Sequence, residues 1–243
     1  MEITGKTVIG DIVRENFKTA QLFEKNNIDF CCSGNITLKE ASEKSGINVQ
    51  ELISGIKLLM DNEDRDSKFI ENLPLDHLCN YIEEKHHAYI NDKAPFIQQK
   101  LEKLCNVHGE NHPELFEVKE LFDGAVGNLT VHMKKEELIL FPYIRNLVQA
   151  KNGQRTEISG MGNIIGPINV MKEEHDIEGE RFRKLAEITN HYTIPDDGCN
   201  TYEITFKNLK DFESDLHRHI HLENNILFPK AIDLEEELMS FVR

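Results

Sequence analysis

The stretch "HMKKEELILFP" at residues 132–142 returns near the end of the chain as "HIHLENNILFP" at residues 219–229. Each copy has a histidine, a glutamate four residues later, and a Phe-Pro pair after four further residues. Residues four apart lie on the same face of a helix, one turn from each other. Each copy therefore places one imidazole and one carboxylate where both can reach the same point.

Both copies lie on stripes of apolar residues that step by three and four, as the buried face of a helix does. The stripes run through Leu129 and Leu216, and a third stripe passes through His175. A fourth reaches His86 or His87, and its periodicity leaves the choice between the two open. Alternation with a period of two is nearly absent. We therefore predict an all-α fold whose main part is an antiparallel four-helix bundle.

Loop sequences separate the four long stretches at 108–113, 151–160 and 193–200. Pro113 suits the first turn of the second helix, and Pro95 is expected to kink the first. Upstream, residues 1–60 carry short amphipathic runs broken by Gly and Asn, which predict about four short helices. A charged run, "DNEDRDSK", follows. We predict a small N-terminal helical domain over 1–62, a linker over 63–72 and the bundle over 73–243.

Four imidazoles and two carboxylates on the buried faces of one bundle are costly unless something pairs them. A metal cation supplies the missing positive charge. Nearly equal spacings, from His87 to His132 and from His175 to His219, divide the bundle into two helix pairs. Each pair contributes two histidines and one glutamate. The pattern predicts a pseudo-twofold site for two metal ions.

Imidazole and carboxylate ligands without a thiolate suit iron or manganese and do not exclude zinc. Six such ligands are too many for one tetrahedral zinc ion but suit two irons, with the glutamates able to bridge them. The alternative is that each histidine is a hydrogen-bonded core residue, as single buried histidines usually are. Under that alternative, His132→Ala changes stability without changing bound metal.

The remaining histidines fit surface or supporting positions better. His108, His112 and His191 fall at predicted helix ends or loops, where we expect them on the surface. His217 and His221 flank His219 on other faces of the same helix. We expect them to be exposed or to contact a ligand rather than to bind metal themselves.

The chain carries 43 acidic and 28 basic residues, which give a net charge of −15. Such a charge repels nucleic-acid phosphates and anionic lipid surfaces, so neither nucleic acid nor membrane is an expected partner. The first residues lack the pattern of an export signal. Five cysteines, two of them adjacent, do not form the spaced framework of a secreted disulfide protein. We expect a cytoplasmic protein.

These motifs carry a resemblance to a known family. The bundle resembles the hemerythrin-like domain, and the whole chain resembles the iron–sulfur cluster repair di-iron proteins, the RIC family of ScdA/YtfE type. The segment "DFCCSGNITLKEA" (29–41) is similar to the signature of that family's N-terminal domain. The two repeated stretches and "GPINVMKEEHDIEGE" (166–180) resemble its di-iron segments in order.

The resemblance implies two iron ions, oxo- or carboxylate-bridged, with both glutamates bridging. It selects His87 over His86, because the family's histidine lies eight residues before a proline, here Pro95. Oxygen-carrying hemerythrins have a further histidine where this chain has Gly179, a departure that weakens an oxygen-carrier interpretation. The implied iron ligands are His87, His132, Glu136, His175, His219 and Glu223.

Two further groups are candidates for function. Cys31 and Cys32 are adjacent and cannot form an unstrained disulfide with each other. They are candidate redox or iron-handling thiols, since thiolates bind iron and iron–sulfur fragments; the alternative is that they only pack a turn. Glu174 and Glu173, beside His175, are candidate acids that tune the ligands, or else belong to a solvated helix face. Cys79, Cys105 and Cys199 are expected to be ordinary thiols.

The function that the resemblance implies is repair of iron–sulfur clusters damaged by nitric oxide or oxidants, by release of iron from a labile di-iron site. Damaged iron–sulfur proteins are then the expected partners, and a homodimer is suggested by the family alone. We expect an iron-handling repair protein more than a conventional turnover enzyme. The alternatives are a reductase or sensor that binds nitric oxide or dioxygen, and simple iron storage or carriage.

Overall fold

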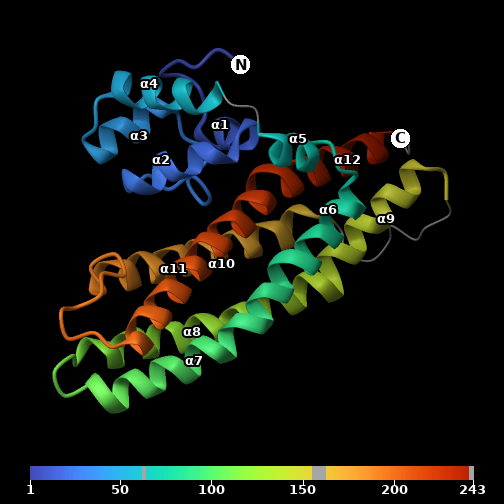
Figure 1. Cartoon of the computed structure of the whole chain (residues 1–243). Helices are drawn as coiled ribbons and strands as arrows, with labels where there is room; N and C mark the ends of the chain where they lie inside the picture. Colours follow the sequence, from blue (N-terminus) through green and yellow to red (C-terminus); the bar gives the residue numbers. More distant parts are fainter. Residues whose placement is uncertain (62–63, 155–162, 241–243) are drawn as a thin grey trace.

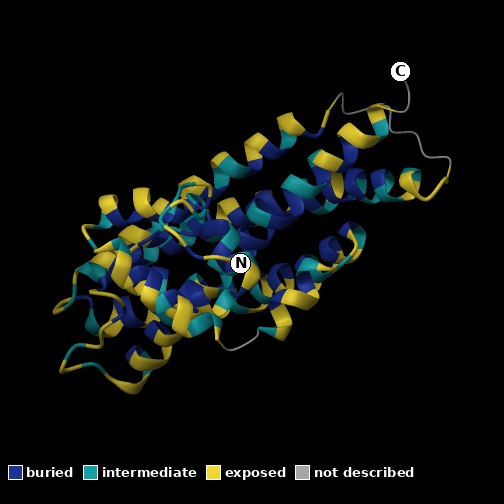
Figure 2. Ribbon diagram, turned by 90° about the horizontal axis from the view of Figure 1, so that it is seen from above, coloured by how far each residue is buried: buried dark blue, intermediate teal, exposed yellow. Residues whose placement is uncertain are grey.

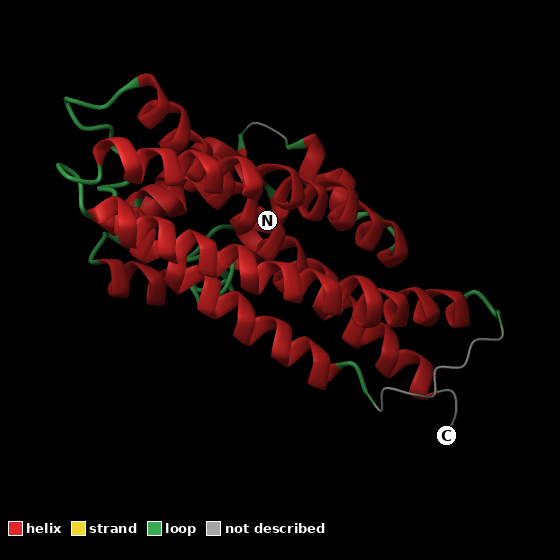
Figure 3. Ribbon diagram, turned by 90° about the horizontal axis from the view of Figure 1, so that it is seen from below, coloured by secondary structure: helices red, strands yellow, loops and turns green. Residues whose placement is uncertain are grey.

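The computed structural model describes residues 1–61, 64–154 and 163–240. Figure 3 shows helices joined by loops throughout these ranges, where the only β-type pairing is an isolated bridge between Val8 and Thr37. The prediction of an all-α fold is confirmed. No helix in the described ranges combines the length and the apolar content that crossing a membrane requires.

The N-terminal module contains the short helices that the sequence predicted (Figure 1). The start of α3 is fixed by a capping box, in which Thr37 and Glu40 each accept a hydrogen bond from the other's backbone N–H. The helix ends at Gly46, which has a left-handed φ of 71°. The elements are α1 (Ile9–Glu15), η1 (Phe17–Thr19), α2 (Ala20–Lys25), α3 (Leu38–Ser45) and α4 (Val49–Met60).

The predicted linker over 63–72 is largely a packed helix, α5 (Arg65–Glu71). Its Ile70 is buried in the core of the bundle, and Ser67 accepts a hydrogen bond from the backbone N–H of Phe17 at 2.9 Å. Because most of its residues are charged, the sequence favours a linker here, although Ile70 is buried. The division of the chain into two domains at this segment stays a prediction.

The bundle has the four predicted long helices, three of which are composite. Figure 1 shows them lying side by side along one long axis, with α7 and α8 on the side away from the N-terminal module. The first is α6 (Leu75–Ile82), η2 (Glu83–His87) and α7 (Ala88–His108); the second is α8 (Glu114–Lys135), η3 (Glu136–Leu140) and α9 (Phe141–Lys151); the third is α10 (Ile165–Ile188); the fourth is α11 (Asn200–Leu222), η4 (Glu223–Leu227) and α12 (Phe228–Ser240).

The repeated Phe-Pro pair explains the irregular turns of the second and fourth helices. Pro142 and Pro229 have no N–H to donate to the carbonyl four residues earlier, and their rings would clash with it. In both helices the preceding turn, η3 or η4, widens to a π-helix. Glu136 is the first residue of η3 and Glu223 the first of η4. Such π-turns inside α-helices often occur at functional sites.

The first long helix widens at η2, which ends at His87. Pro95, where we expected a kink, lies inside α7, and the helix continues through it. The departure from α-helical geometry is therefore one turn or more before the proline. Pro113 directly precedes α8, in agreement with its predicted place at the start of the second helix.

The apolar interior forms two clusters, and Figure 2 shows where buried residues alternate with exposed ones along the helices. One cluster joins the N-terminal module to the end of the bundle formed by α7, α8 and α11, and includes Phe30 and Leu216. The other fills the opposite end of the bundle and includes Leu140 and Phe228. The buried histidines and glutamates lie between them. The apolar packing on both sides therefore fixes the height at which the polar residues meet.

The N-terminal module contacts the bundle where its backbone at Phe30 and Gly34 packs closely against Asn225 of η4. An ideal Cβ at Gly34 would lie 2.5 Å from the Phe30 carbonyl oxygen and 2.8 Å from Asn225 Oδ1. Asn225 Nδ2 in turn donates to that Phe30 oxygen at 3.3 Å. Only a glycine at position 34 permits this contact.

We therefore expect Gly34→Ala to destabilise the protein by about 1–3 kcal/mol, because backbone has to shift to admit the methyl group. Gly127→Ala is the matched control: its Cβ would meet nothing within 4 Å inside α8, and alanine there should stabilise the helix by about 0.5–1 kcal/mol. The midpoint of thermal unfolding measures both. Equal shifts in the two variants would contradict this account of the docking contact.

Candidate metal centre

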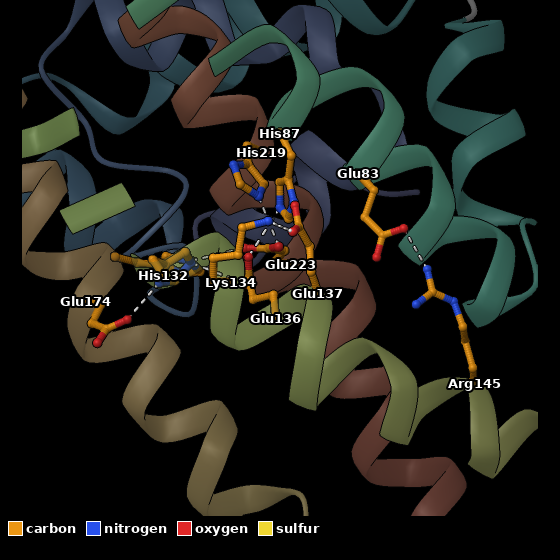
Figure 4. A network of polar contacts seen from close by, with 11 residues as sticks. Glu83, His87, His132, Lys134, Glu136, Glu137, Arg145, Glu174, His219 and Glu223 are labelled. Atoms are coloured by element: carbon orange, nitrogen blue, oxygen red, sulfur yellow. Dashed lines mark hydrogen bonds and ion pairs between the residues drawn. The ribbon is translucent and has the colours of Figure 1, made fainter. Parts of the chain in front are cut away.

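The six predicted ligands meet in the polar layer of the bundle, and Figure 4 labels five of them, all except His175. They come from all four long helices, and each is at most 3% exposed. They form two overlapping groups, and within each group the ligand atoms lie within 4.8 Å of one another. The first group is His87, Glu136, His219 and Glu223; the second is His132, Glu136, His175 and Glu223.

Each glutamate faces one histidine of each group. Glu136 Oε2 lies 3.3 Å from His87 Nε2, and its Oε1 lies 3.2 Å from His132 Nε2. Glu223 Oε1 lies 3.0 Å from His219 Nε2, and its Oε2 lies 3.1 Å from His175 Nε2. The two oxygens of each carboxylate are thus directed to different groups, which is the arrangement of a carboxylate that bridges two cations.

The two groups do not correspond to the two halves of the sequence. The first takes His87 from the first helix and His219 from the fourth, and the second takes His132 from the second helix and His175 from the third. Each helix pair that we identified by spacing therefore contributes one histidine to each group. The sequence repeat pairs His87 with His132 and His175 with His219, whereas the geometry pairs His87 with His219 and His132 with His175.

Three of the four imidazoles are oriented by an acceptor at Nδ1. Glu174 Oε2 lies 2.8 Å from the Nδ1 atom of His132, and Lys135 binds the other oxygen of Glu174. Glu174 thus contacts a histidine, as expected, but the histidine is on the neighbouring helix rather than the adjacent His175. Glu173, its neighbour, is exposed.

The other two acceptors were missed in the sequence. Glu137 Oε1 lies 3.0 Å from His87 Nδ1, and Asn224 Oδ1 lies 3.0 Å from His175 Nδ1. Each directly follows a ligand glutamate in the repeated motif, at the same position in both copies. That shared position, always an oxygen-bearing side chain, was the signal that could have identified them.

The orientation of the rings leaves their Nε2 atoms available to a cation. We infer that Nδ1–H donates to Glu174 in His132 and to Asn224 in His175, which leaves a lone pair on both Nε2 atoms. Those two atoms lie 3.1 Å apart. Two facing lone pairs repel, so this pair needs either a proton on one nitrogen, which the raised pKa of His132 favours, or a cation between the two nitrogens. Metal-binding histidines usually have such an acceptor at their second nitrogen.

Several buried atoms in the layer also lack a hydrogen bond among the described residues. They are His87 Nε2, His219 Nδ1, both oxygens of Glu136 and Glu223 Oε2. An unsatisfied buried polar atom is costly, and a buried carboxylate more so. A donor set of imidazole nitrogens and carboxylate oxygens fits iron. The residues present therefore fit a resident metal, and the geometry offers two positions for it.

The charges in the layer favour ionised carboxylates. Burial alone raises the pKa of Glu223, but His219 and His175 outweigh it and hold that pKa well below the ordinary value. Burial lowers the pKa of His132, yet Glu136 and Glu223 raise it to about 10. The carboxylates thus already carry the negative charge that a cation requires.

The other histidines of these helices are buried more often than we expected. His86, the rejected neighbour of His87, is 3% exposed, and its Nδ1 contacts Asp215 at 3.1 Å. His221, which we expected to be exposed or to contact a ligand, is 1% exposed and lies 3.0 Å from Asn225 Nδ2. Burial lowers its pKa to about 3, so it is neutral. The N-terminal module covers this face, which a bundle-only interpretation could not foresee.

His217 is partly buried by the same module, and its Nδ1 lies 3.5 Å from Glu24 Oε1. His191 is exposed, and His108 and His112 are partly exposed at the far end of the bundle. None of these belongs to the metal cluster of the described residues. The expectation that they are not ligands fits this placement.

The paired cysteines lie beside the metal layer. Cys32 Sγ is 3.5 Å from the backbone oxygen of His175, and an ideal Cβ on Gly179 would be 3.3 Å from the same sulfur. Asn224, which orients His175, also donates from Nδ2 to the Cys31 carbonyl at 3.2 Å. Because Gly179 has no side chain, the cysteine loop can pack against α10 at the position where hemerythrins have a further histidine.

Of the remaining cysteines, Cys79 and Cys105 are buried. Cys199 is not an ordinary thiol, in contrast to our expectation. It is exposed, and His108 Nε2 lies 3.2 Å from its sulfur. That contact, with backbone N–H groups at the start of α11, lowers its pKa to about 7.

A cavity of about 250 Å³ opens beside the second group of ligands. His132 and His175 form part of its wall, together with Glu174 and Glu178. Glu178 is 3% exposed, and burial raises its pKa although Asn128 and Arg181 donate hydrogen bonds to it. His87 stacks on Phe141, and His219 stacks on His86.

Comparisons with known proteins agree with this geometry. The family described as hemerythrin HHE cation binding domain matches residues 80–231, and the family ScdA_N, a domain of unknown function, matches residues 5–59. A hemerythrin-like domain implies that the bound cation is iron.

Relatives resemble the chain over most of its length. The iron–sulfur cluster repair protein ScdA of Staphylococcus haemolyticus (strain JCSC1435) is 28% identical over 228 residues, 94% of this chain and 99% of the relative. The iron–sulfur cluster repair proteins YtfE of Yersinia pseudotuberculosis serotype IB (strain PB1/+) and Yersinia pestis (strain Pestoides F) are 33% identical over 216 residues, 88% of this chain and 91% of each relative. This chain therefore belongs to the hemerythrin HHE family and, through both of its parts, to the iron–sulfur cluster repair proteins of the ScdA and YtfE type.

Proposed function

We propose that this chain repairs damaged iron–sulfur clusters by supplying iron from a site for two iron ions in its bundle. The observation that carries the proposal is the division of each carboxylate: Glu136 and Glu223 each direct one oxygen to either group of histidines. The named relatives are iron–sulfur cluster repair proteins. The bound iron would supply the metal that a damaged cluster has lost.

The residues of the chain have distinct tasks in this proposal. Glu136 and Glu223 hold both positions together, and their negative charges offset part of the positive charge of the cations. Glu137, Glu174 and Asn224 keep three imidazoles turned with Nε2 toward the metal. Hydrophobic clusters cover the layer above and below, and the cavity reaches it at His132 and His175.

The surroundings of the two positions favour release from one of them. His132 and His175 line the cavity, which distinguishes this side, since Phe228 stacks on His175 just as Phe141 stacks on His87. Glu174 and Glu178 place two carboxyl groups along the cavity wall, where they attract a departing cation. Of the two positions, the one at His132 and His175 is therefore the labile one.

The rival function, binding of nitric oxide or dioxygen by a reductase or sensor, requires the metal to stay in place during the reaction. The cavity beside one position serves ligand entry and metal exit equally well, so it favours neither. The names of the relatives favour repair. Cytoplasmic location and homodimer formation stay part of the proposal as family expectations.

Each bridging glutamate should be needed for both iron ions. We expect Glu136→Ala and Glu223→Ala each to reduce the iron content from two ions per chain to below one, since either change removes a ligand from both groups. His87→Ala removes a ligand from one group only and should retain about one ion. Glu120→Ala, on the exposed face of α8, is the control and should retain both.

Elemental analysis and Mössbauer spectra of protein purified without added metal measure these contents and the coupling between the irons. Two coupled irons in either glutamate variant would overturn the shared site. If the wild type holds two coupled irons but Glu120→Ala also loses iron, general destabilisation of the protein, and not loss of a ligand, controls the iron content.

The Nδ1 acceptor of His132 should tune the affinity of the labile position. We expect Glu174→Leu to weaken iron binding there by about 10–100-fold, the usual effect of removing such a partner. Glu174→Gln keeps an acceptor oxygen and should restore most of the affinity. Glu173→Leu, one residue away and exposed, is the control. The rate and extent of iron loss to a chelator measure the effect; equal loss from the 173 and 174 variants would refute it.

Repair itself should appear as transfer of iron. An iron–sulfur enzyme whose cluster has been damaged by nitric oxide should regain activity when it is mixed with this protein loaded with radioactive iron. The enzyme should also acquire the radioactive label. We expect Glu223→Ala to produce neither effect. An equal amount of free ferrous iron with a chelator controls for leakage. Turnover of nitric oxide while all iron stays on this chain would support the rival function instead.

A further inference from the structure

A second cluster of metal-binding side chains lies outside the bundle layer, in the loop of the N-terminal module. One ligand atom each from Asp29, Cys31 and Cys32 lies within 4.8 Å of the others. We propose that these three residues form a separate site for one thiophilic divalent cation, with at least one coordination position open. Nothing in the proposed repair function assigns them this role.

The distance between the sulfurs carries the proposal. Cys31 Sγ and Cys32 Sγ are 3.8 Å apart, far beyond the roughly 2.0 Å of a disulfide. Two thiolates that bind one tetrahedral cation at about 2.3 Å lie about 3.8 Å apart. The two thiols are therefore already at the separation of a shared cation.

The third ligand is held toward the sulfurs by the backbone. Asp29 Oδ1 accepts hydrogen bonds from the N–H groups of Cys31 at 3.1 Å and Cys32 at 2.9 Å, and lies 3.4 Å from Cys31 Sγ. Asp29 Oδ2 contacts Arg183 of α10 at 3.4 Å. Each thiol releases its proton to solvent on binding, so three negative charges face a divalent cation and one guanidinium. The loaded site has no net charge.

The bundle keeps this loop in place. Asn224 Nδ2 donates to the Cys31 carbonyl, and Asn225 Nδ2 donates to the Phe30 carbonyl at 3.3 Å. Cys31 is 4% exposed, while Cys32 is partly exposed and provides the way in. Ligands held by surrounding hydrogen bonds in this way lose little freedom when a cation binds.

The site also lies beside the bundle ligands, since Cys32 Sγ is 3.5 Å from the backbone oxygen of His175. This place beside His175 suits the thiols to receive iron that leaves the bundle. That role rests on the proposed function. The binding of a cation by the thiols does not depend on that role, and the experiment separates the two.

The test adds Cd²⁺ to protein already loaded with iron and records the ultraviolet sulfur-to-cadmium charge-transfer band together with the iron content. We expect one Cd²⁺ per chain with the band, and no loss of iron. Cys31→Ser and Cys32→Ser should abolish the band, and Asp29→Asn should weaken binding at least tenfold. Cys199→Ser, which removes the exposed thiol beside His108, is the control and should bind as wild type does.

X-ray absorption of cadmium-loaded wild-type protein needs no variant and should find two sulfur neighbours. Absence of the band in wild type, one sulfur neighbour, or loss of the band in Cys199→Ser would overturn the thiol site. If the band appears while the bundle holds no iron, the proposed function fails and this site stands. If iron is present and the band is absent, this site alone fails.

Discussion

The burial of two carboxylates among four imidazoles is the constraint on which the rest of the structure depends. Neither kind of group tolerates an apolar core alone, and together they leave unsatisfied oxygens and facing nitrogens that a bound cation would satisfy. The apolar clusters on both sides hold the helices so that these groups meet. The packing therefore supports the polar layer, and a cation bound there would offset the cost of burying it.

The widened turns show how the chain achieves the convergence. A regular helix would continue past Glu136, but the turn that begins there widens to a π-helix just before the Phe-Pro pair, and the same occurs at Glu223; the missing N–H of the proline suits such a turn. Both carboxylates then begin a π-turn, and the residues after them, Glu137 and Asn224, are directed to imidazoles of the preceding helix. One repeated motif therefore supplies a carboxylate that faces two histidines, the turn that presents it and the acceptor for a neighbouring imidazole.

Much of this could be predicted from the sequence because helical periodicity is a local property. His132, Glu136, His219 and Glu223 follow from spacing alone, and four long apolar stripes define the bundle. The choice of His87 over His86 needed the family resemblance, because both fall on stripes with apolar neighbours. What could not be predicted depends on contacts between helices: the partition of the ligands into two groups, the service of Glu174 to His132, and the burial of His221 under the N-terminal module.

That module joins its own chemistry to the bundle through one side chain. Asn224 accepts at Oδ1 from His175 and donates from Nδ2 to the carbonyl of Cys31, so one amide fixes both an imidazole of the metal layer and the cysteine loop. Gly179 removes the side chain that would keep the loop away. A displacement of the loop therefore removes the Cys31 carbonyl to which Asn224 Nδ2 donates, so the amide is free to rotate. The imidazole of His175, beside the cavity, then loses the acceptor that orients it. The position of the N-terminal module and the hold on one metal ion are in this way parts of the same hydrogen-bonded unit.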